Sequence, residues 1–178
     1  MTVGHPEQDL IQKAKAGDNL AYEDLLRPNL APAARLAHTL LGNPDEAEDA
    51  VQEAAVKGWR KLGNLRAGAP FQPWFLGIVV RQVRTIQRAP WWTLIRLPEV
   101  PVQSAPAIET WMDGEDLRLA IGNLPRLQRE AVLLHFYLDL SIQDVAASLG
   151  LSVPGVKSRI NRALHRLRAD IASAELSA

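Results

Sequence analysis

Prolines crowd the middle of this 178-residue chain and divide it into two parts. Four of them fall in one short segment, at Pro90, Pro98, Pro101 and Pro106. Because proline lacks a backbone N–H and its ring clashes with the preceding turn, a long helix cannot cross this segment. On either side, apolar residues recur every three or four positions, and the alternation typical of strands is nearly absent. We therefore predict an all-α protein with two small helical domains, residues 1–89 and 115–178, joined by a proline-rich linker, residues 90–114.

Local signals place the helices of the first domain. Asp18 or Asn19 can cap one helix, and Pro28 and Pro32 are expected to interrupt or bend it. Asn43 can open the next helix, whose first turn is acidic, as the helix dipole favours. In the linker, the tryptophans are expected either to pack on a domain or to be covered by a partner; they are Trp91, Trp92 and Trp111.

The composition restricts the class of protein. There is no cysteine, which excludes disulfides and thiolate metal sites and fits a reducing cytoplasm. No apolar run approaches the roughly 18 residues of a membrane span, and the N-terminus lacks the pattern of a signal peptide, so we expect a cytoplasmic protein without stable membrane insertion. The four histidines are scattered, and neither an HExxH motif nor a glycine-rich phosphate loop occurs. We therefore expect no enzyme activity, no cofactor and no metal site.

Charge is distributed unevenly although the formal net charge is zero. Acids cluster over residues 45–53, whereas residues 54–98 contain no acid and eight Lys or Arg. A second basic block runs from Lys157 to Arg168. Opposed patches of this kind favour two partners, one basic and one acidic. The alternative is that each patch is an ordinary solvated helix face.

The stretch 141–168 has the pattern of a helix-turn-helix. Ser141 can cap a short helix, Gly150 supplies the turn, and Ser152 can cap a longer helix. One side of the longer helix is apolar, and the other carries cationic and planar donors that suit phosphates and base edges. The pattern therefore predicts DNA binding, with a structural helix-turn-helix that has a solvated basic face as the alternative.

Two segments carry a family resemblance. "SIQDVAASLGLSVPGVKSRINRALHRLR", preceded by "LPRLQREAVLLHFYLDL", resembles the fourth conserved region of bacterial sigma factors. "PDEAEDAVQEAAVKGWRKLGNLRAGAPFQPWFLGIVVRQV" resembles their second region. The two segments in this order, joined by a short linker, are similar to the extracytoplasmic-function group over residues 8–90 and 115–172. The resemblance implies a subunit that binds core RNA polymerase, directs promoter-specific transcription initiation at −10 and −35 elements, and is regulated by an anti-sigma factor.

The resemblance also implies roles for individual positions. An acidic helix would bind the clamp helices of the polymerase through Asp49, Gln52 and Glu53. The loop and helix that follow would contact the separated −10 strand through Asn64, Leu65, Arg66, Ala67, Gly68, Phe71, Arg81, Gln82, Arg84, Thr85 and Arg88. The last long helix would read the −35 duplex through Ser152, Pro154, Gly155, Lys157, Ser158, Arg159, Asn161, Arg162 and Arg166.

The physical chemistry of these positions agrees with the implied roles. Asp49, Gln52 and Glu53 are three and four residues apart, so they share one helix face. DNA would repel this acidic face, which therefore needs a different partner, unless the acids only stabilise their own helix. Cations beside an apolar loop suit a single strand.

The chain departs from the common family pattern at several positions. Leu65 stands where Phe is frequent, and Gly77 and Arg81 stand where Arg and Asn are frequent. Gly155 replaces Thr, which removes a hydroxyl that could contact phosphate. Asp139 replaces Gly before the short helix of the helix-turn-helix, and we expect the fold to survive because Asp tolerates the left-handed conformation moderately well.

A second reading is a stand-alone helix-turn-helix regulator that binds operator DNA without core polymerase. Such a protein needs a dimer surface or a ligand pocket, and the sequence gives no clear signal for either. Promoter-dependent transcription with purified core polymerase separates the two readings.

Overall fold

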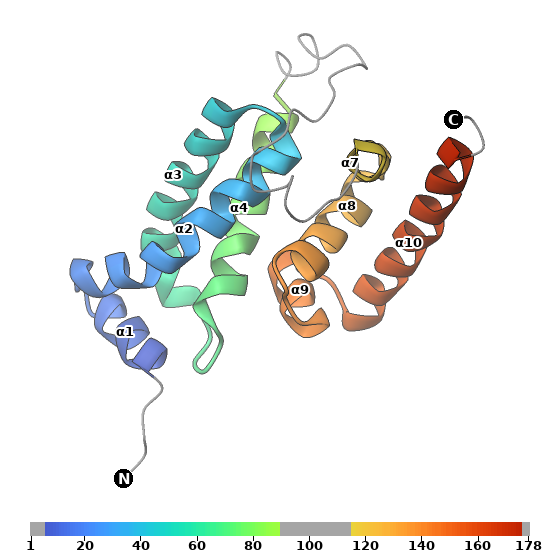
Figure 1. Ribbon diagram of the computed structural model, residues 1–178. Helices are drawn as coiled ribbons and strands as arrows, with labels where there is room; N and C mark the ends of the chain where they lie inside the picture. Colours follow the sequence, from blue (N-terminus) through green and yellow to red (C-terminus); the bar gives the residue numbers. More distant parts are fainter. Residues whose placement is uncertain (1–5, 90–114, 176–178) are drawn as a thin grey trace.

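The computed structural model of the chain describes residues 6–89 and 115–175, and every element assigned within them is a helix, which confirms the predicted all-α class. The helices form two groups (Figure 1), an N-terminal group before residue 90 and a C-terminal group after residue 114. The predictions for the linker and its tryptophans lie outside the described residues. None of the helices in residues 6–89 and 115–175 combines the length and the apolar character that crossing a membrane requires.

The N-terminal group is built from helices whose starts follow the capping signals. They are α1 (Pro6–Lys15), α2 (Asn19–Leu41), α3 (Pro44–Lys61), η1 (Leu62–Asn64) and α4 (Phe71–Gln87). The Asp18 carboxylate accepts two backbone N–H groups in the first turn of α2, and the Asn43 side chain does the same for α3. Each cap contributes about 1 kcal/mol because it satisfies donors that the helix leaves free. Gly42 ends α2 in the left-handed conformation, with φ 68°.

Helix α2 runs without a break through Pro28 and Pro32, so of the two predicted outcomes, an interruption or a bend, the interruption does not occur. Each proline removes one backbone hydrogen bond, to the carbonyl four residues earlier. The affected carbonyls belong to Asp24 and Pro28, both on exposed positions where water can hydrate them. The opposite side of α2 is buried, for example at Ala33, Leu36 and Ala37, and this packing offsets the lost bonds.

The core of the N-terminal group lies where α2, α3 and α4 pack against one another. Its largest fully buried side chains include Leu36, Leu41, Leu62, Phe71, Phe75, Leu76 and Val79. The rings of Phe71 and Phe75 stack with centroids 5.7 Å apart at the start of α4. Burial of each such side chain contributes roughly 1.5–3 kcal/mol.

The C-terminal group contains the predicted helix-turn-helix. Its elements are α7 (Glu115–Asn123), α8 (Arg126–Val132), the π-helical turn η2 (Leu133–Tyr137), α9 (Ile142–Leu149) and α10 (Val153–Glu175). Ser141 caps α9 by accepting the N–H of Asp144 at 3.1 Å, and Gly150 turns the chain at φ 67°. Asp139 adopts φ 54°, which confirms that this position needs the left-handed conformation.

The two groups are joined by a continuous apolar core. Helix α4 of the N-terminal group packs on α9, and the C-terminal group lies beside α4 in Figure 1. The contact includes a hydrogen bond from the Ser148 hydroxyl to the Pro73 carbonyl, 2.6 Å long. The domains that the sequence separates therefore pack against each other in the described residues.

Candidate functional site

An acidic strip is exposed on α3. Asp49, Gln52 and Glu53 all lie on the exposed side of the helix, as their spacing predicts. Ala47, Ala50, Val51 and Ala54 form the buried side of the helix. Glu53 lies 3.5 Å from the Lys57 ammonium, but the Glu53 side chain is 63% exposed and that of Lys57 39%, so this pair contributes little to stability. The strip therefore remains available to a basic partner.

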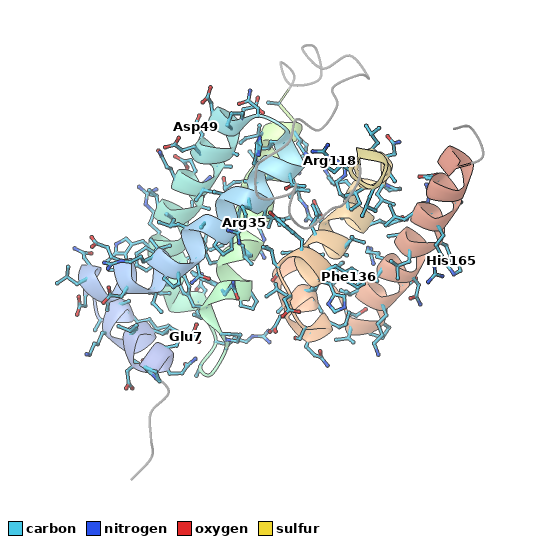
Figure 2. The ribbon with its side chains drawn as sticks, viewed as in Figure 1. Glu7, Arg35, Asp49, Arg118, Phe136 and His165 are labelled. Carbon is cyan, nitrogen blue, oxygen red and sulfur yellow. The ribbon has the colours of Figure 1, made fainter. Side chains whose placement is uncertain are left out.

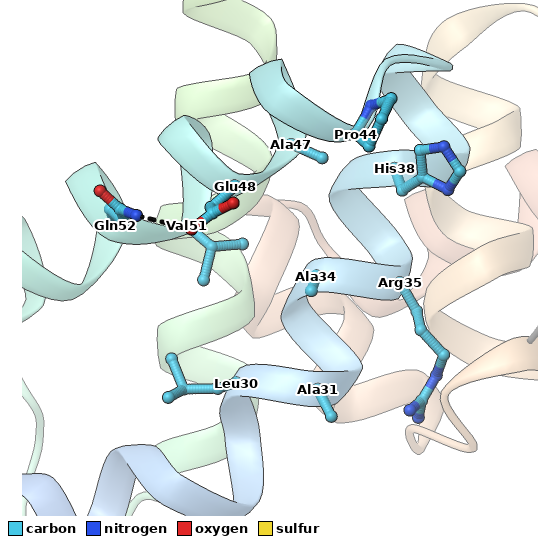
Figure 3. Close-up of a pocket in the computed structure, with 10 residues that line it drawn as sticks. All are labelled: Leu30, Ala31, Ala34, Arg35, His38, Pro44, Ala47, Glu48, Val51 and Gln52. Atoms are coloured by element: carbon cyan, nitrogen blue, oxygen red, sulfur yellow. Dashed lines mark hydrogen bonds between the residues drawn. The ribbon is translucent and has the colours of Figure 1, made fainter. Parts of the chain in front are cut away.

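An apolar groove of about 710 Å³ lies beside this strip, between α2 and α3 (Figure 3). It is lined by Leu30, Ala31, Ala34, Arg35, His38, Pro44, Ala47, Glu48, Val51 and Gln52. Leu30 is 40% exposed, which is unusual for a large apolar side chain that flanks a core. Partial burial lowers the pKa of His38. Gln52 belongs to both the acidic strip and the lining of the groove, and Glu48 of the same helix also lines the groove, so the two surfaces are continuous.

The loop between η1 and α4 is tied to α1. Lys15 donates to the Leu65 carbonyl at 2.6 Å, Gln8 donates to the Ala69 carbonyl at 3.2 Å, and the Glu7 carboxylate accepts the Phe71 N–H at 3.2 Å. These bonds fix both ends of the loop. Its exposed residues are Arg66, Ala67, Gly68 and Pro70, and Asn64 at the end of η1 is exposed as well.

The C-terminal half of α4 carries cations of two kinds. Arg81 and Arg88 are exposed, together with Thr85. Arg84 is engaged: its Nε and Nη2 atoms donate to the two carboxylate oxygens of Glu130 on α8, at 2.9 and 2.5 Å. This hydrogen bonding raises the pKa of Arg84 above its usual value. Arg84 is therefore bound to the other helical group.

The outer face of α10 is strongly basic and open. Lys157, Asn161, Arg162 and Arg166 are exposed, while the side that carries Val156, Ile160, Ala163 and Leu167 is buried. Arg162 donates to the Ser158 hydroxyl at 2.7 Å, and Arg159 donates to the Gly155 carbonyl at 3.0 Å. These bonds orient two guanidinium groups without neutralising them. Figure 2 shows Asp49 on α3 and His165 on α10 far apart, on opposite sides of this view.

A second, smaller pocket lies where α8 meets α10. It has a volume of about 430 Å³ and is lined by Pro125, Arg126, Leu127, Gln128, Arg159 and Arg162. Three guanidinium groups around one pocket favour an anion. The Gln128 side-chain oxygen is buried there without a hydrogen-bond partner. Among residues 6–89 and 115–170, no group of His, Asp and Glu is placed to hold a metal ion.

Comparison with known proteins divides the chain at the same place as the two helical groups. The family model for sigma-70 region 2 matches residues 16–93, and the model for sigma-70 region 4 matches residues 114–167. The RNA polymerase sigma-E factor of Streptomyces avermitilis is 30% identical over 171 residues, 91% of each chain. The ECF RNA polymerase sigma factor SigM of Mycobacterium tuberculosis H37Rv is 32% identical over 164 residues, 90% of this chain and 82% of the relative.

The chain belongs to the extracytoplasmic-function RNA polymerase sigma factors.

Two solved structures are similar to this chain. CnrH, in complex with the cytosolic domain of CnrY, matches this sigma factor with a TM-score of 0.74 and 24% identity, over 95% of this chain and 99% of that chain. The likeness to CnrH shows the fold alone. The sigma factor RpoE of Bartonella quintana, in complex with the anti-sigma factor NepR, matches with a TM-score of 0.65 and 27% identity, over 85% of this chain and 96% of that chain.

The structure places the predicted −10 residues of this sigma factor in three different environments. Arg81, Thr85 and Arg88 are exposed with the loop tip, and Gln82 accepts a hydrogen bond from Lys57 at 2.6 Å. Leu65 and Phe71 are buried, 3% and 0% exposed, because they anchor the loop in the core. Their side chains pack into the core beneath the loop, so in this conformation they are not exposed to a DNA strand. Arg84 is occupied by Glu130.

The predicted −35 residues, in contrast, lie together, from Ser152 just before α10 to Arg166 within it. Exposed Ser152 and Pro154 precede half-buried Gly155, Ser158 and Arg159. Sequence reasoning missed the α2–α3 groove and Arg126. The groove is lined by residues of two helices, α2 and α3, whose packing a single-helix pattern does not reveal, and Arg126 belongs to a different helix from the basic block.

Proposed function

We propose that this sigma factor binds the clamp helices of core RNA polymerase through the acidic strip and the α2–α3 groove together. Asp49 and Glu53 would face the basic side chains of the clamp, while apolar side chains of the partner enter beside Leu30 and Val51. The strip supplies attraction and orientation, and the groove supplies burial of apolar surface. The observation that carries the proposal is the separation of charge, with exposed acids on α3 and exposed cations on α4 and α10.

The loop and the outer half of α4 would hold the separated −10 strand. Arg66 at the loop tip and the exposed Arg81 and Arg88 suit a phosphate backbone, and the tie of the loop to α1 keeps its shape fixed. Leu65 and Phe71 would act indirectly, by supporting the loop. The α10 face would enter the major groove of the −35 duplex, with Arg159 and Arg162 oriented toward bases or phosphates.

Arg126 extends this −35 surface. It lines the same pocket as Arg159 and Arg162 but comes from the start of α8. A guanidinium at this place suits a backbone phosphate at the edge of the site, where it would add affinity without reading sequence.

An anti-sigma factor would regulate this sigma factor. The matching structures are of CnrH with the cytosolic domain of CnrY and of RpoE with the anti-sigma factor NepR. An anti-sigma factor of this chain would compete with polymerase for the α2–α3 groove, because exposed apolar surface there needs a cover. The protein acts without catalysis of its own, in the cytoplasm, where core polymerase and promoter DNA are present.

The test is promoter-dependent transcription in vitro. Transcript sequencing after overproduction identifies the target promoters, and purified bacterial core RNA polymerase is then supplied with the protein and with promoters changed at −10 or −35. We expect transcripts only from the intact promoter and only with both proteins. Tight operator binding without any capture of core polymerase would support the stand-alone regulator instead.

A further inference from the structure

The contact between α4 and α9 depends on one glycine. A Cβ atom placed on Gly77 would lie 2.5 Å from the backbone oxygen of Ser148 and 3.1 Å from its Cα. A separation of 2.5 Å is too short for a Cβ atom, and the opposing atoms belong to the backbone and cannot rotate away. Ser148 is 2% exposed, and its hydroxyl bonds the Pro73 carbonyl one turn before Gly77. This seat, Gly77 with Pro73 and Ser148, brings the two helical groups into close contact.

The second part of the contact is the ion pair between Arg84 and Glu130. Glu130 is fully buried, and Arg84 is 20% exposed. A buried carboxylate is costly unless a cation and hydrogen bonds compensate it. The next guanidinium, that of Arg126, lies 3.9 Å away and is about half exposed. Arg84 is therefore the main partner of Glu130, and it comes from the other helical group.

The same contact covers part of the proposed −10 surface. A pocket of about 390 Å³ lies between the loop and α9, lined by Asn64, Leu65, Arg66, Ala69, Pro70, Pro73 and Trp74 on one side and by Asp144, Ala146, Ala147, Gly150 and Leu151 on the other. Helix α9 thus stands against the loop that would hold the strand. The guanidinium fork of Arg84 is filled by both oxygens of Glu130 and cannot bind a phosphate in the same geometry.

We propose that the C-terminal group locks the −10 surface of its own chain. The Glu130 carboxylate occupies the position on Arg84 that a phosphate of the separated promoter strand takes after opening, and the Gly77 seat keeps α9 over the loop. Residues 90–114 contain enough chain for the groups to separate by tens of ångströms. The lock concerns the regulation of the proposed −10 site and therefore rests on the proposed function.

The first test measures the distance between the groups in the full chain without DNA or polymerase. The chain has no cysteine, so Gln12→Cys and Asp170→Cys, both at exposed positions, give a clean pair for spin labels. Figure 1 shows α1 and the end of α10 on opposite sides of the molecule, so we expect one narrow distribution of long distances in the parent protein and a broader distribution in Gly77→Ala. The matched control is Gly63→Ala, since a Cβ at Gly63 meets nothing within 4 Å. Circular dichroism checks that helix content is unchanged. An unchanged distance in Gly77→Ala overturns the lock.

The second test measures binding of a fluorescein-labelled oligothymidylate. We expect Gly77→Ala to bind about tenfold more tightly than the parent, equivalent to roughly 1.4 kcal/mol. The gain should disappear in Gly77→Ala combined with Arg84→Ala. Opening without a gain, or a gain that persists in the double variant, overturns the role of Arg84. If the proposed function fails instead, the parent does not support transcription with core polymerase, whatever these two measurements show.

Discussion

On α10, Arg162 extends from an exposed position and is steadied by Ser158 of the preceding turn, whereas on α4 Arg84 is folded against the buried carboxylate of Glu130. Both helices carry several cations in a stretch with few acids, so their sequences predict similar surfaces. The difference comes from the neighbour: α10 faces solvent on its polar side, and α4 faces α8 and α9. Local charge therefore indicates the chemistry of a surface, while tertiary packing decides whether that surface is available.

Removal of the Arg84 side chain should produce the largest effect on stability. Arg84→Ala removes the short ion pair of the buried Glu130 and leaves Arg126, at 3.9 Å, and Arg129 as nearby cations, and we expect a loss of about 3 kcal/mol in the free energy of unfolding. Arg162→Ala should change the same quantity by less than about 0.5 kcal/mol because Arg162 is exposed. Urea unfolding monitored by circular dichroism measures both.

A double replacement shows whether the ion pair itself is the cause. Arg84→Met combined with Glu130→Leu removes both charges, and we expect it to recover most of the stability lost in Arg84→Ala. If Arg84→Ala is as stable as the parent, the two cationic surfaces do not differ as described here.

Removal of two cations from α10 should produce the largest effect on duplex binding. We expect Arg159→Ala combined with Arg162→Ala to weaken binding of a −35 duplex by roughly 2 kcal/mol, about thirtyfold. The slope of the logarithm of the binding constant against the logarithm of the salt concentration should become shallower by nearly 2. Fluorescence anisotropy over a series of salt concentrations measures this. Arg60→Ala removes an exposed cation from α3 and should have little effect; equal losses in both proteins would contradict the α10 assignment.

The acidic strip on α3 is expected to bind polymerase, whereas the two cationic surfaces are expected to bind DNA. Asp49→Lys combined with Glu53→Lys should weaken capture of core polymerase about tenfold, through repulsion from a basic partner, without weakening duplex binding. Glu23→Lys combined with Asp24→Lys changes the net charge by the same amount on an exposed part of α2. Capture assays on immobilised polymerase should separate the two variants, and an identical response in both would remove the specific role of the strip.

Arg126→Gln should have the smallest effect of this series. We expect about a threefold loss of duplex affinity that is equal for −35 and unrelated sequences, and a fall of about 1 in the salt slope. The measurement is the same anisotropy titration on the two duplexes. A loss confined to the −35 duplex would show that Arg126 reads sequence and is not a phosphate contact.

The features that the sequence predicts are those that depend on neighbouring positions. Asp18, Asn43 and Ser141 cap helices as expected because a cap acts within three residues. The left-handed turn at Gly150 and the exposed face of α10 also follow from local spacing. The same local rules predict an interruption or a bend at Pro28, where burial of the opposite side of α2 keeps the helix continuous.

The features that the sequence does not predict connect distant positions. Arg84 and Glu130 are 46 residues apart, and no periodicity relates them. The proximity of Gly77 to Ser148 likewise depends on how two helices cross, although the replacement of a frequent Arg by Gly at position 77 marks the place. Leu65 and Phe71 were expected at the DNA surface because they belong to the loop, but an apolar side chain next to a core is drawn into it.

The bonds from α1 to the loop set a limit on how this protein can be shortened. The region 2 match begins at residue 16, after the last residue of α1. A fragment cut at that boundary would keep every matched position and still lose Glu7, Gln8 and Lys15, which hold the loop backbone. Truncated versions intended for promoter studies should therefore start upstream of Pro6, and affinity tags are better placed beyond the opposite terminus.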